Sequence, residues 1–132
     1  YEIVQSVFPD WKFTPSDTVA AFGLHGALLI GERHQIDDDA DKWFGPLSNF
    51  AITLRSGGIA EPGHARDVLD GPLSALKHLV GLLATDRHNP QVAAGEIITT
   101  GTLTKAMPVK PGERWTTELD GIPLAGIDIR FG

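Results

Sequence analysis

Apolar and polar residues alternate along several short stretches of the chain, a pattern typical of β-strands with one buried face. The clearest stretch runs from Asn49 to Arg55, and the turn Ser56-Gly57-Gly58 leads from it into a second arm that ends near His64. Two such arms joined by a glycine turn predict a β-hairpin. Further strands are predicted at 2–8, 27–30 (a buried strand), 96–100, 114–119 and 122–131.

One stretch has helical spacing instead. It begins at Pro72, a residue that suits a first helical turn, and Asn89-Pro90 lies beyond its end. Its apolar positions form a single stripe, which we expect to pack in the core against a sheet: Leu73, Leu76, Leu79, Val80 and Leu83. Thr14-Pro15-Ser16-Asp17 predicts a turn or a short helical start, and Trp43-Phe44-Gly45-Pro46 predicts a loop.

Many strands, one main helix and no βαβ rhythm indicate an α+β fold that is mostly β. We expect a mixed, mainly antiparallel β-roll or sandwich with the one main helix packed on it. The length of 132 residues suits one domain. Because the chain opens within a predicted strand and without an initiator Met, we expect it to be a piece of a longer polypeptide.

Composition narrows the class of protein. The net charge of −6 argues against nucleic acid as a partner, and no apolar run approaches the roughly 18 residues of a membrane span. There is no cysteine, which excludes disulfides and thiolate metal sites, so we expect a cytoplasmic protein. The acidic run 37–41 lacks the glycine and distal glutamate of a calcium loop, which favours a solvated loop or a helix start.

The richest candidate chemistry lies in Thr99-Thr100-Gly101-Thr102. Hydroxyls gather there around a glycine that permits a tight turn or a close approach to a ligand. Such a segment suits a small oxygen-rich molecule, for example a carboxylate or a keto acid. The alternative is that these threonines only satisfy backbone groups, since β-proteins contain many of them.

Longer motifs extend this observation. Gly-Glu-Ile-Ile-x-Thr-Gly-Thr at 95–102 and Val-x-Pro-Gly-Glu at 109–113 resemble the fumarylacetoacetate hydrolase superfamily, particularly its 2-oxo acid hydratases and 4-oxalocrotonate decarboxylases. Segments 2–6, 16–31 and 71–73 are similar to further family motifs. The resemblance covers nearly the whole chain but only the second half of a family member. It implies a single catalytic-type domain over residues 1–132, the C-terminal part of a longer chain, with that family's C-terminal fold.

The resemblance also implies a metal and a substrate. Family members hold Mg²⁺ or Mn²⁺ with three carboxylates, one of which matches Glu2, whereas the other two form a Glu-x-Glu pair in the family's first half. The metal binds a small 2-oxo acid and stabilises an enolate. Thr100, Gly101 and Thr102 would then bind substrate. His25 is a candidate catalytic acid or base, although a lone histidine in a glycine-rich strand is often structural.

Two departures from the family pattern leave the substrate open. Gln5 stands where relatives often have Asp, and Ala21-Phe22 stands where they often have Asp-Asn. The leading hypothesis is a metal-dependent hydratase that adds water to a 2-oxo-alkenoate in the catabolism of aromatic compounds. A decarboxylase of the 4-oxalocrotonate type and a non-catalytic β-domain are the alternatives. The family resemblance also implies a homo-oligomer built on dimers.

Overall fold

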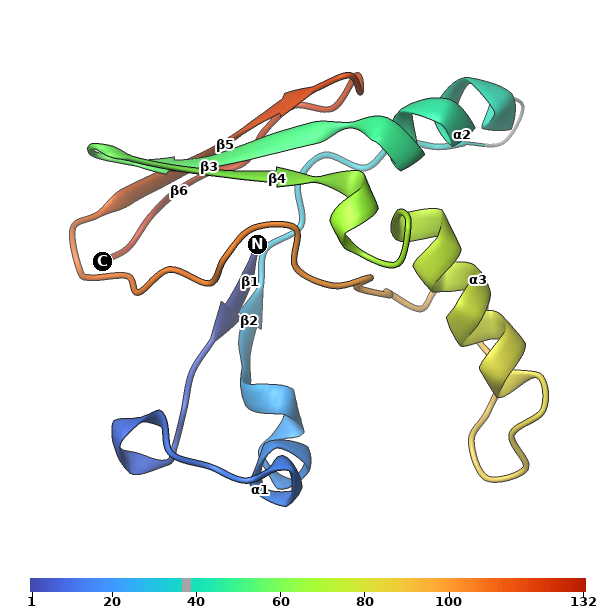
Figure 1. Cartoon of the computed structure of the whole chain (residues 1–132), viewed down its shortest axis with the longest axis horizontal. Coiled ribbons are helices and arrows are strands. Elements are labelled where there is room, and N and C mark those ends of the chain that lie inside the picture. Colours follow the sequence, from blue (N-terminus) through green and yellow to red (C-terminus); the bar gives the residue numbers. More distant parts are fainter. Residues whose placement is uncertain (37–38) are drawn as a thin grey trace. The chain divides into compact units, whose positions relative to one another are not determined.

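The chain forms two compact units, Tyr1–Arg33 and His34–Gly132 (Figure 1). The computed structural model describes residues 1–36 and 39–132. Asp37 and Asp38 of the acidic run therefore lie outside the described residues. Asp39 and Asp41 stand at the start of a helix, as one of the two interpretations of that run predicted. The expectation of one catalytic-type domain stays a prediction.

The first unit pairs two short antiparallel strands, β1 (Glu2–Val4) and β2 (His25–Leu28). Between them come η1 (Pro9–Trp11), α1 (Pro15–Ala20) and η2 (Phe22–Leu24). The strand predicted at 2–8 is thus shorter than expected. The prediction of a buried strand at 27–30 is wrong in its burial: among the described residues β2 pairs with β1 alone, Ala27 and Ile30 are exposed, and the two leucines between them are half-buried.

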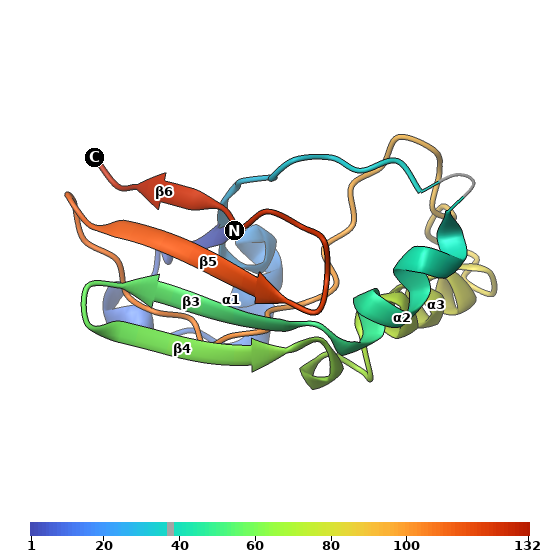
Figure 2. The ribbon, with the colours of Figure 1, turned by 90° about the horizontal axis from the view of Figure 1, so that it is seen from above.

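The second unit is built on a four-stranded antiparallel sheet in the order β4-β3-β5-β6 (Figure 2). Its strands are β3 (Ala51–Ser56), β4 (Ile59–His64), β5 (Arg114–Asp120) and β6 (Asp128–Arg130). The predicted hairpin is confirmed as β3–β4, with Gly57 at the turn in the left-handed region at φ +54°. A mostly β, α+β architecture is therefore confirmed.

Helix α2 (Ala40–Asn49) occupies the stretch predicted as a loop. Pro46 lies inside it and removes one backbone hydrogen bond, yet the helix persists. The helix is stabilised instead by the burial of Trp43, which joins Phe50, Ala65 and Ile122 in the core of this unit. Tertiary packing here outweighs the local preference of Gly45-Pro46 for a turn.

Helix α3 (Pro72–Leu83) begins where the sequence predicted. The predicted packing of its apolar stripe is wrong, since α3 contacts α2 and none of its residues is fully buried. The stripe does not pack against the sheet because α2 and α3 both lie beyond one end of it (Figure 2). The exposed fraction of Val80 is 47%. Among the described residues, no helix has the length and apolar character of a membrane span.

Two predicted strands differ from the structure. Residues 96–100 form no strand and lie in a long irregular segment between α3 and β5. The strand predicted at 122–131 is reduced to β6. Before β6 the chain passes so close to β5 that a Cβ on Gly126 would lie 1.7 Å from the Thr117 carbonyl oxygen. The regular pairing of this segment with β5 begins only at Asp128.

Candidate active site

Glu2 and His25 come together across the two strands of the first unit. Their closest atoms, Glu2 Oε1 and His25 Nδ1, lie 3.4 Å apart. The side chains remain 38% and 45% exposed respectively, so both stay open to a ligand. The structure therefore joins two residues that the sequence named separately, one as a metal ligand and one as an acid or base.

A break in the strand register makes this meeting possible. Ile3 pairs with Ala27, whereas Val4 pairs with His25, so that Gly26 is the extra residue of a β-bulge. A Cβ at Gly26 would lie 2.9 Å from the Ile3 carbonyl oxygen and would also press on the Gln5 side chain. Only glycine fits there without displacement, and the bulge aims His25 toward Glu2.

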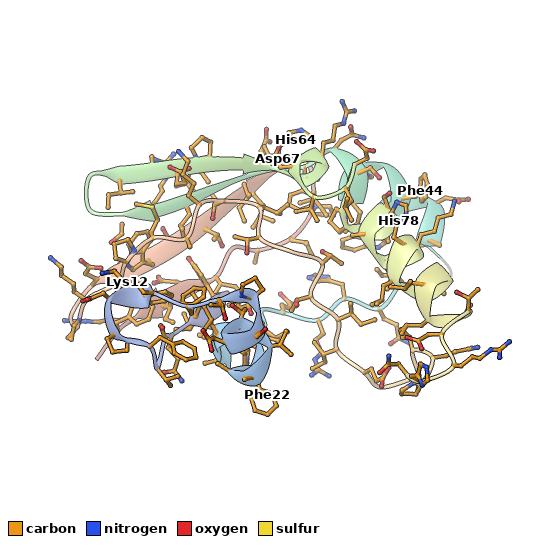
Figure 3. The ribbon with its side chains drawn as sticks, turned by 60° about the horizontal axis from the view of Figure 1, so that its bottom comes forward. Lys12, Phe22, Phe44, His64, Asp67 and His78 are labelled. Atoms are coloured by element: carbon orange, nitrogen blue, oxygen red, sulfur yellow. The ribbon has the colours of Figure 1, made fainter. Side chains whose placement is uncertain are left out.

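His25 also lines an open pocket of about 370 Å³ within the first unit. The polar side chains in the lining are those of His25 and Gln5, and the remaining residues are apolar: Val7, Phe8, Ala20, Ala21 and Phe22. Phe22 points away from the ribbon at the edge of this unit (Figure 3) and is 89% exposed. The three positions that depart from the family pattern thus share one pocket. Sequence reasoning noticed each departure but did not bring them together.

A capping box holds α1, which contributes Ala20 to the pocket. The Thr14 hydroxyl accepts a hydrogen bond from the Asp17 N–H, and the Asp17 carboxylate accepts hydrogen bonds from the Thr14 N–H and hydroxyl. The hydrogen bond from the Thr14 N–H, supported by that from its hydroxyl, lowers the pKa of Asp17. Thr14 at the N-cap with Pro15 after it is a start signal that the sequence already contained.

The loop with Thr100, Gly101 and Thr102 belongs to the second unit. Thr100 is half-buried and Thr102 is exposed, and neither hydroxyl is hydrogen-bonded to another described residue. Gly101 has φ +112°, and a Cβ there would lie 3.2 Å from Val68 Cγ1. The hydroxyls are thus available to a ligand, while the glycine rests against the segment after β4.

Leu103 anchors this loop. Its side chain packs against the core, and a Cβ on Gly63 of β4 would lie 2.0 Å from its carbonyl oxygen. The short helix η3 (Ala65–Asp67) comes directly after β4 in the chain. At its start, the Asp67 carboxylate accepts a hydrogen bond from the His64 N–H, and His64 Nδ1 accepts one from the Arg66 N–H (Figure 3). His64 therefore has a structural role as a cap.

Metal binding needs more ligands than these residues offer. In the part of the chain that the structure describes, no three His, Asp or Glu side chains gather closely enough to hold a metal ion. Glu2 is a single carboxylate, and a hard divalent cation takes several oxygen ligands. Glu2 therefore fits as one member of a larger donor set.

No protein-family model matches the chain. Curated relatives do: a 2-keto-4-pentenoate hydratase of Dechloromonas aromatica is 31% identical over 92% of this chain, and a 4-oxalocrotonate decarboxylase of Pseudomonas putida is 29% identical over 98%. A 2-oxo-hept-4-ene-1,7-dioate hydratase of Escherichia coli is 29% identical over 87%. The chain spans less than half the length of these relatives, between 40% and 46%.

Solved structures agree with the sequences. The 4-oxalocrotonate decarboxylase of Pseudomonas putida G7 in complex with magnesium and adipate superposes with a TM-score of 0.73 at 28% identity, over 99% of this chain and 47% of that one. The same enzyme in complex with calcium and acetate gives a TM-score of 0.72. The resemblance seen in the motifs is thereby confirmed. In sequence and in fold, the chain is similar to just under half of the length of 2-keto-4-pentenoate hydratases and 4-oxalocrotonate decarboxylases.

Proposed function

We propose that the chain is part of a divalent-metal-dependent hydratase that adds water to a 2-oxo-alkenoate in the catabolism of aromatic compounds. The observation that carries this proposal is the contact between Glu2 and His25 beside an open pocket. A carboxylate and an imidazole in one exposed site provide a metal ligand and a proton-transferring group. The similarity of the chain to a 2-keto-4-pentenoate hydratase and to a solved 4-oxalocrotonate decarboxylase supports the same chemistry.

In this proposal Glu2 supplies one ligand to Mg²⁺ or Mn²⁺, and the remaining carboxylates come from outside the 132 residues. A bound divalent cation supplies Lewis acidity at the head group of the 2-oxo acid. The chain's own residues bind and orient the substrate. His25 turns Nδ1 toward Glu2, which leaves its second ring nitrogen to accept or donate a proton at the substrate.

Thr100, Gly101 and Thr102 are proposed to hold the oxygens of the substrate. Two hydroxyls without described partners and a glycine that exposes its backbone make a suitable donor set for a carboxylate. The free hydroxyls support this role because nothing else in the described chain uses them.

A decarboxylase is the second candidate. It is supported by the similarity to solved 4-oxalocrotonate decarboxylase structures, which are 27–28% identical to this chain. Both reactions begin with the same 2-oxo acid head group, so the two candidates differ in product. Release of CO₂ from 4-oxalocrotonate would identify the decarboxylase, and addition of water to 2-hydroxypenta-2,4-dienoate would identify the hydratase.

We further propose that residues 1–132 are the C-terminal, catalytic-type part of a longer polypeptide that works in the cytoplasm as a dimer-based homo-oligomer. The share of each relative that the chain covers and the absence of cysteine support this setting. Light scattering coupled to size-exclusion chromatography would measure the oligomeric state of the intact protein.

Calorimetry tests the proposed function directly. Oxalate mimics the head group of a 2-oxo acid, and we expect it to bind the intact protein in the presence of Mg²⁺ but not after treatment with EDTA. Restored binding on adding Mg²⁺ back would exclude damage by the chelator. Equal binding of oxalate with and without metal, or none at all, would contradict the proposal.

A further inference from the structure

The pocket beside His25 has a lining that carries almost no charge. Its polar groups are the amide of Gln5 and the imidazole of His25, and no Lys, Arg, Asp or Glu of the described residues takes part in the lining. A carboxylate that enters such a pocket loses water and gains no cation in return, which is costly. An uncharged hydrocarbon tail loses nothing of this kind.

The wider charge distribution of the first unit points the same way. Tyr1–Arg33 contains two cationic side chains, Lys12 and Arg33, against four carboxylates, Glu2, Asp10, Asp17 and Glu32. Lys12 is paired with Asp10 at 3.9 Å, both side chains being more than 80% exposed.

Size fits a small tail as well. A volume of about 370 Å³ lies near the lower end of the range for pockets that bind small molecules. Because His25 contacts Glu2 and also lines the pocket, a substrate whose head group is held near Glu2 can extend its tail into the space between Gln5 and Ala21.

We propose that this pocket receives the tail of a monocarboxylic 2-oxo acid and discriminates against a second carboxylate at the far end of the substrate. The proposal rests on the proposed function, because it assumes that the head group binds near Glu2. Beyond that function, it specifies the class of substrate. It also names Gln5 as a residue whose replacement changes the preference between monocarboxylic and dicarboxylic 2-oxo acids. Dicarboxylic 2-oxo acids are expected to be poor ligands.

The test compares three probes by calorimetry on the intact protein with Mg²⁺: oxalate, 2-oxopentanoate and 2-oxoadipate. Oxalate carries the head group alone, and the other two differ in the charge of the tail. We expect 2-oxopentanoate to bind at least about tenfold more tightly than 2-oxoadipate, a difference of about 1.4 kcal/mol. Equal affinities of the wild type for the two keto acids would overturn the proposal by themselves.

Variants at Gln5 test whether the lining of the pocket causes the preference for monocarboxylic over dicarboxylic acids. Gln5→Arg adds a cation and is expected to reduce or reverse the preference by about tenfold, whereas Gln5→Leu keeps the lining uncharged and preserves it. Circular dichroism of both variants checks that they are folded, and Gln5→Lys is the substitute if Gln5→Arg is not. An unchanged preference in a folded cationic variant would overturn the proposal. Failure of oxalate to bind would instead count against the proposed function.

Discussion

Gly26 shows how much one residue decides at this site. It is the extra residue of the bulge that sets Val4 opposite His25, and the Ile3 carbonyl leaves no room for a Cβ at its position. Glu2 and His25 owe their 3.4 Å contact to that local irregularity. At the scale of single residues, the candidate active site therefore depends on the missing side chain of Gly26 as well as on the two polar ones.

The first prediction concerns Glu2. Glu2→Gln keeps the shape of the side chain but removes its charge, so we expect at least about a hundredfold loss of Mg²⁺-dependent turnover, in the range found when a group that stabilises charge is removed. The matched control is Glu32→Gln, the same change at an exposed position of the same unit. Turnover assays at saturating Mg²⁺ measure both. Wild-type turnover in Glu2→Gln would remove Glu2 from the site.

At the scale of elements, the loop 99–104 is held by β4 rather than by a strand ladder of its own. Leu103 packs on the core, and its carbonyl passes over Gly63 at a distance that excludes any larger residue. Gly101 rests on Val68 in the same region. The position of Thr100 and Thr102 is thus set by the packing of their loop against the hairpin β3–β4.

This arrangement predicts the effect of filling the space at Gly63. Gly63→Ala places a Cβ against the backbone of Leu103, and we expect it to lower the free energy of unfolding by about 1–3 kcal/mol, as other overpacked sites do. Gly58→Ala, at the tip of the same hairpin, meets nothing within 4 Å and is expected to be close to neutral. Urea unfolding monitored by tryptophan fluorescence compares the two. A neutral Gly63→Ala would show that the loop is not anchored there.

The pairing of β5 with β6 predicts a dependence on pH. The side-chain hydrogen bond from Arg114 holds the pKa of Asp128 below its ordinary value, with Nε and Oδ1 2.9 Å apart. A carboxyl whose pKa is lower in the folded than in the unfolded state stabilises the fold above the unfolded pKa, about 3.9, and this contribution is lost as the pH falls through the folded pKa.

The free energy of unfolding should therefore decrease as the pH falls from about 4, and it should decrease less steeply in Asp128→Asn. Urea titrations between about pH 2.5 and pH 5 measure both slopes. Asp86 lies outside the sheet, and its pKa is lowered chiefly by a hydrogen bond from the Asn89 side chain. The pH dependence of the free energy of unfolding in Asp86→Asn can therefore be compared with that in Asp128→Asn. Identical slopes in the wild type and Asp128→Asn would contradict the prediction.

The elements that the sequence predicted well are those whose signals are local. Alternation and a glycine turn define β3–β4, and helical spacing after Pro72 defines α3. The run Ile97-Ile98-Thr99-Thr100 has the residues of a strand, but it lies between two glycines at positive φ and has no partner strand among the described residues. Pairing partners are a property of the whole fold, and composition does not show them.

The same division holds for the candidate site. Motif similarity named Glu2 and the Thr100–Thr102 loop, because residue identity is what a motif records, and the acid–base chemistry of histidine named His25. The contact between Glu2 and His25 depends on the bulge, and the pocket depends on where α1 and η2 bring Ala21 and Phe22. These are consequences of backbone geometry that no single position reveals.

At the scale of the whole molecule, the chain contains two units, each with a part of the proposed machinery. The first holds Glu2, His25 and the pocket, and the second holds the threonine loop. A metal site needs further carboxylates, and the relatives are more than twice as long as this chain. Binding of metal and substrate is therefore a property to be measured on the intact protein.

A thermal prediction follows at this scale. Ligands that bind only the folded state raise its stability, by about 2.7 kcal/mol at a free concentration a hundred times the dissociation constant. We expect Mg²⁺ and oxalate together to raise the Tm of the intact protein by more than the sum of their separate effects. Calorimetric scans with each alone and with both measure this. Purely additive shifts would indicate independent binding.

Because Leu103 is anchored against β4, the connection that precedes the threonine loop can vary in length, whereas the position of the loop itself is fixed. Upstream of it, a turn in which Asp86 accepts hydrogen bonds from His88 and Asn89 is exposed and contributes nothing to the core. Insertions or a reporter tag near this turn would change the length of the connection without moving the threonines, because Leu103 fixes their register against β4. Evolution and protein engineering can therefore lengthen this connection while the loop that carries Thr100 and Thr102 keeps its place.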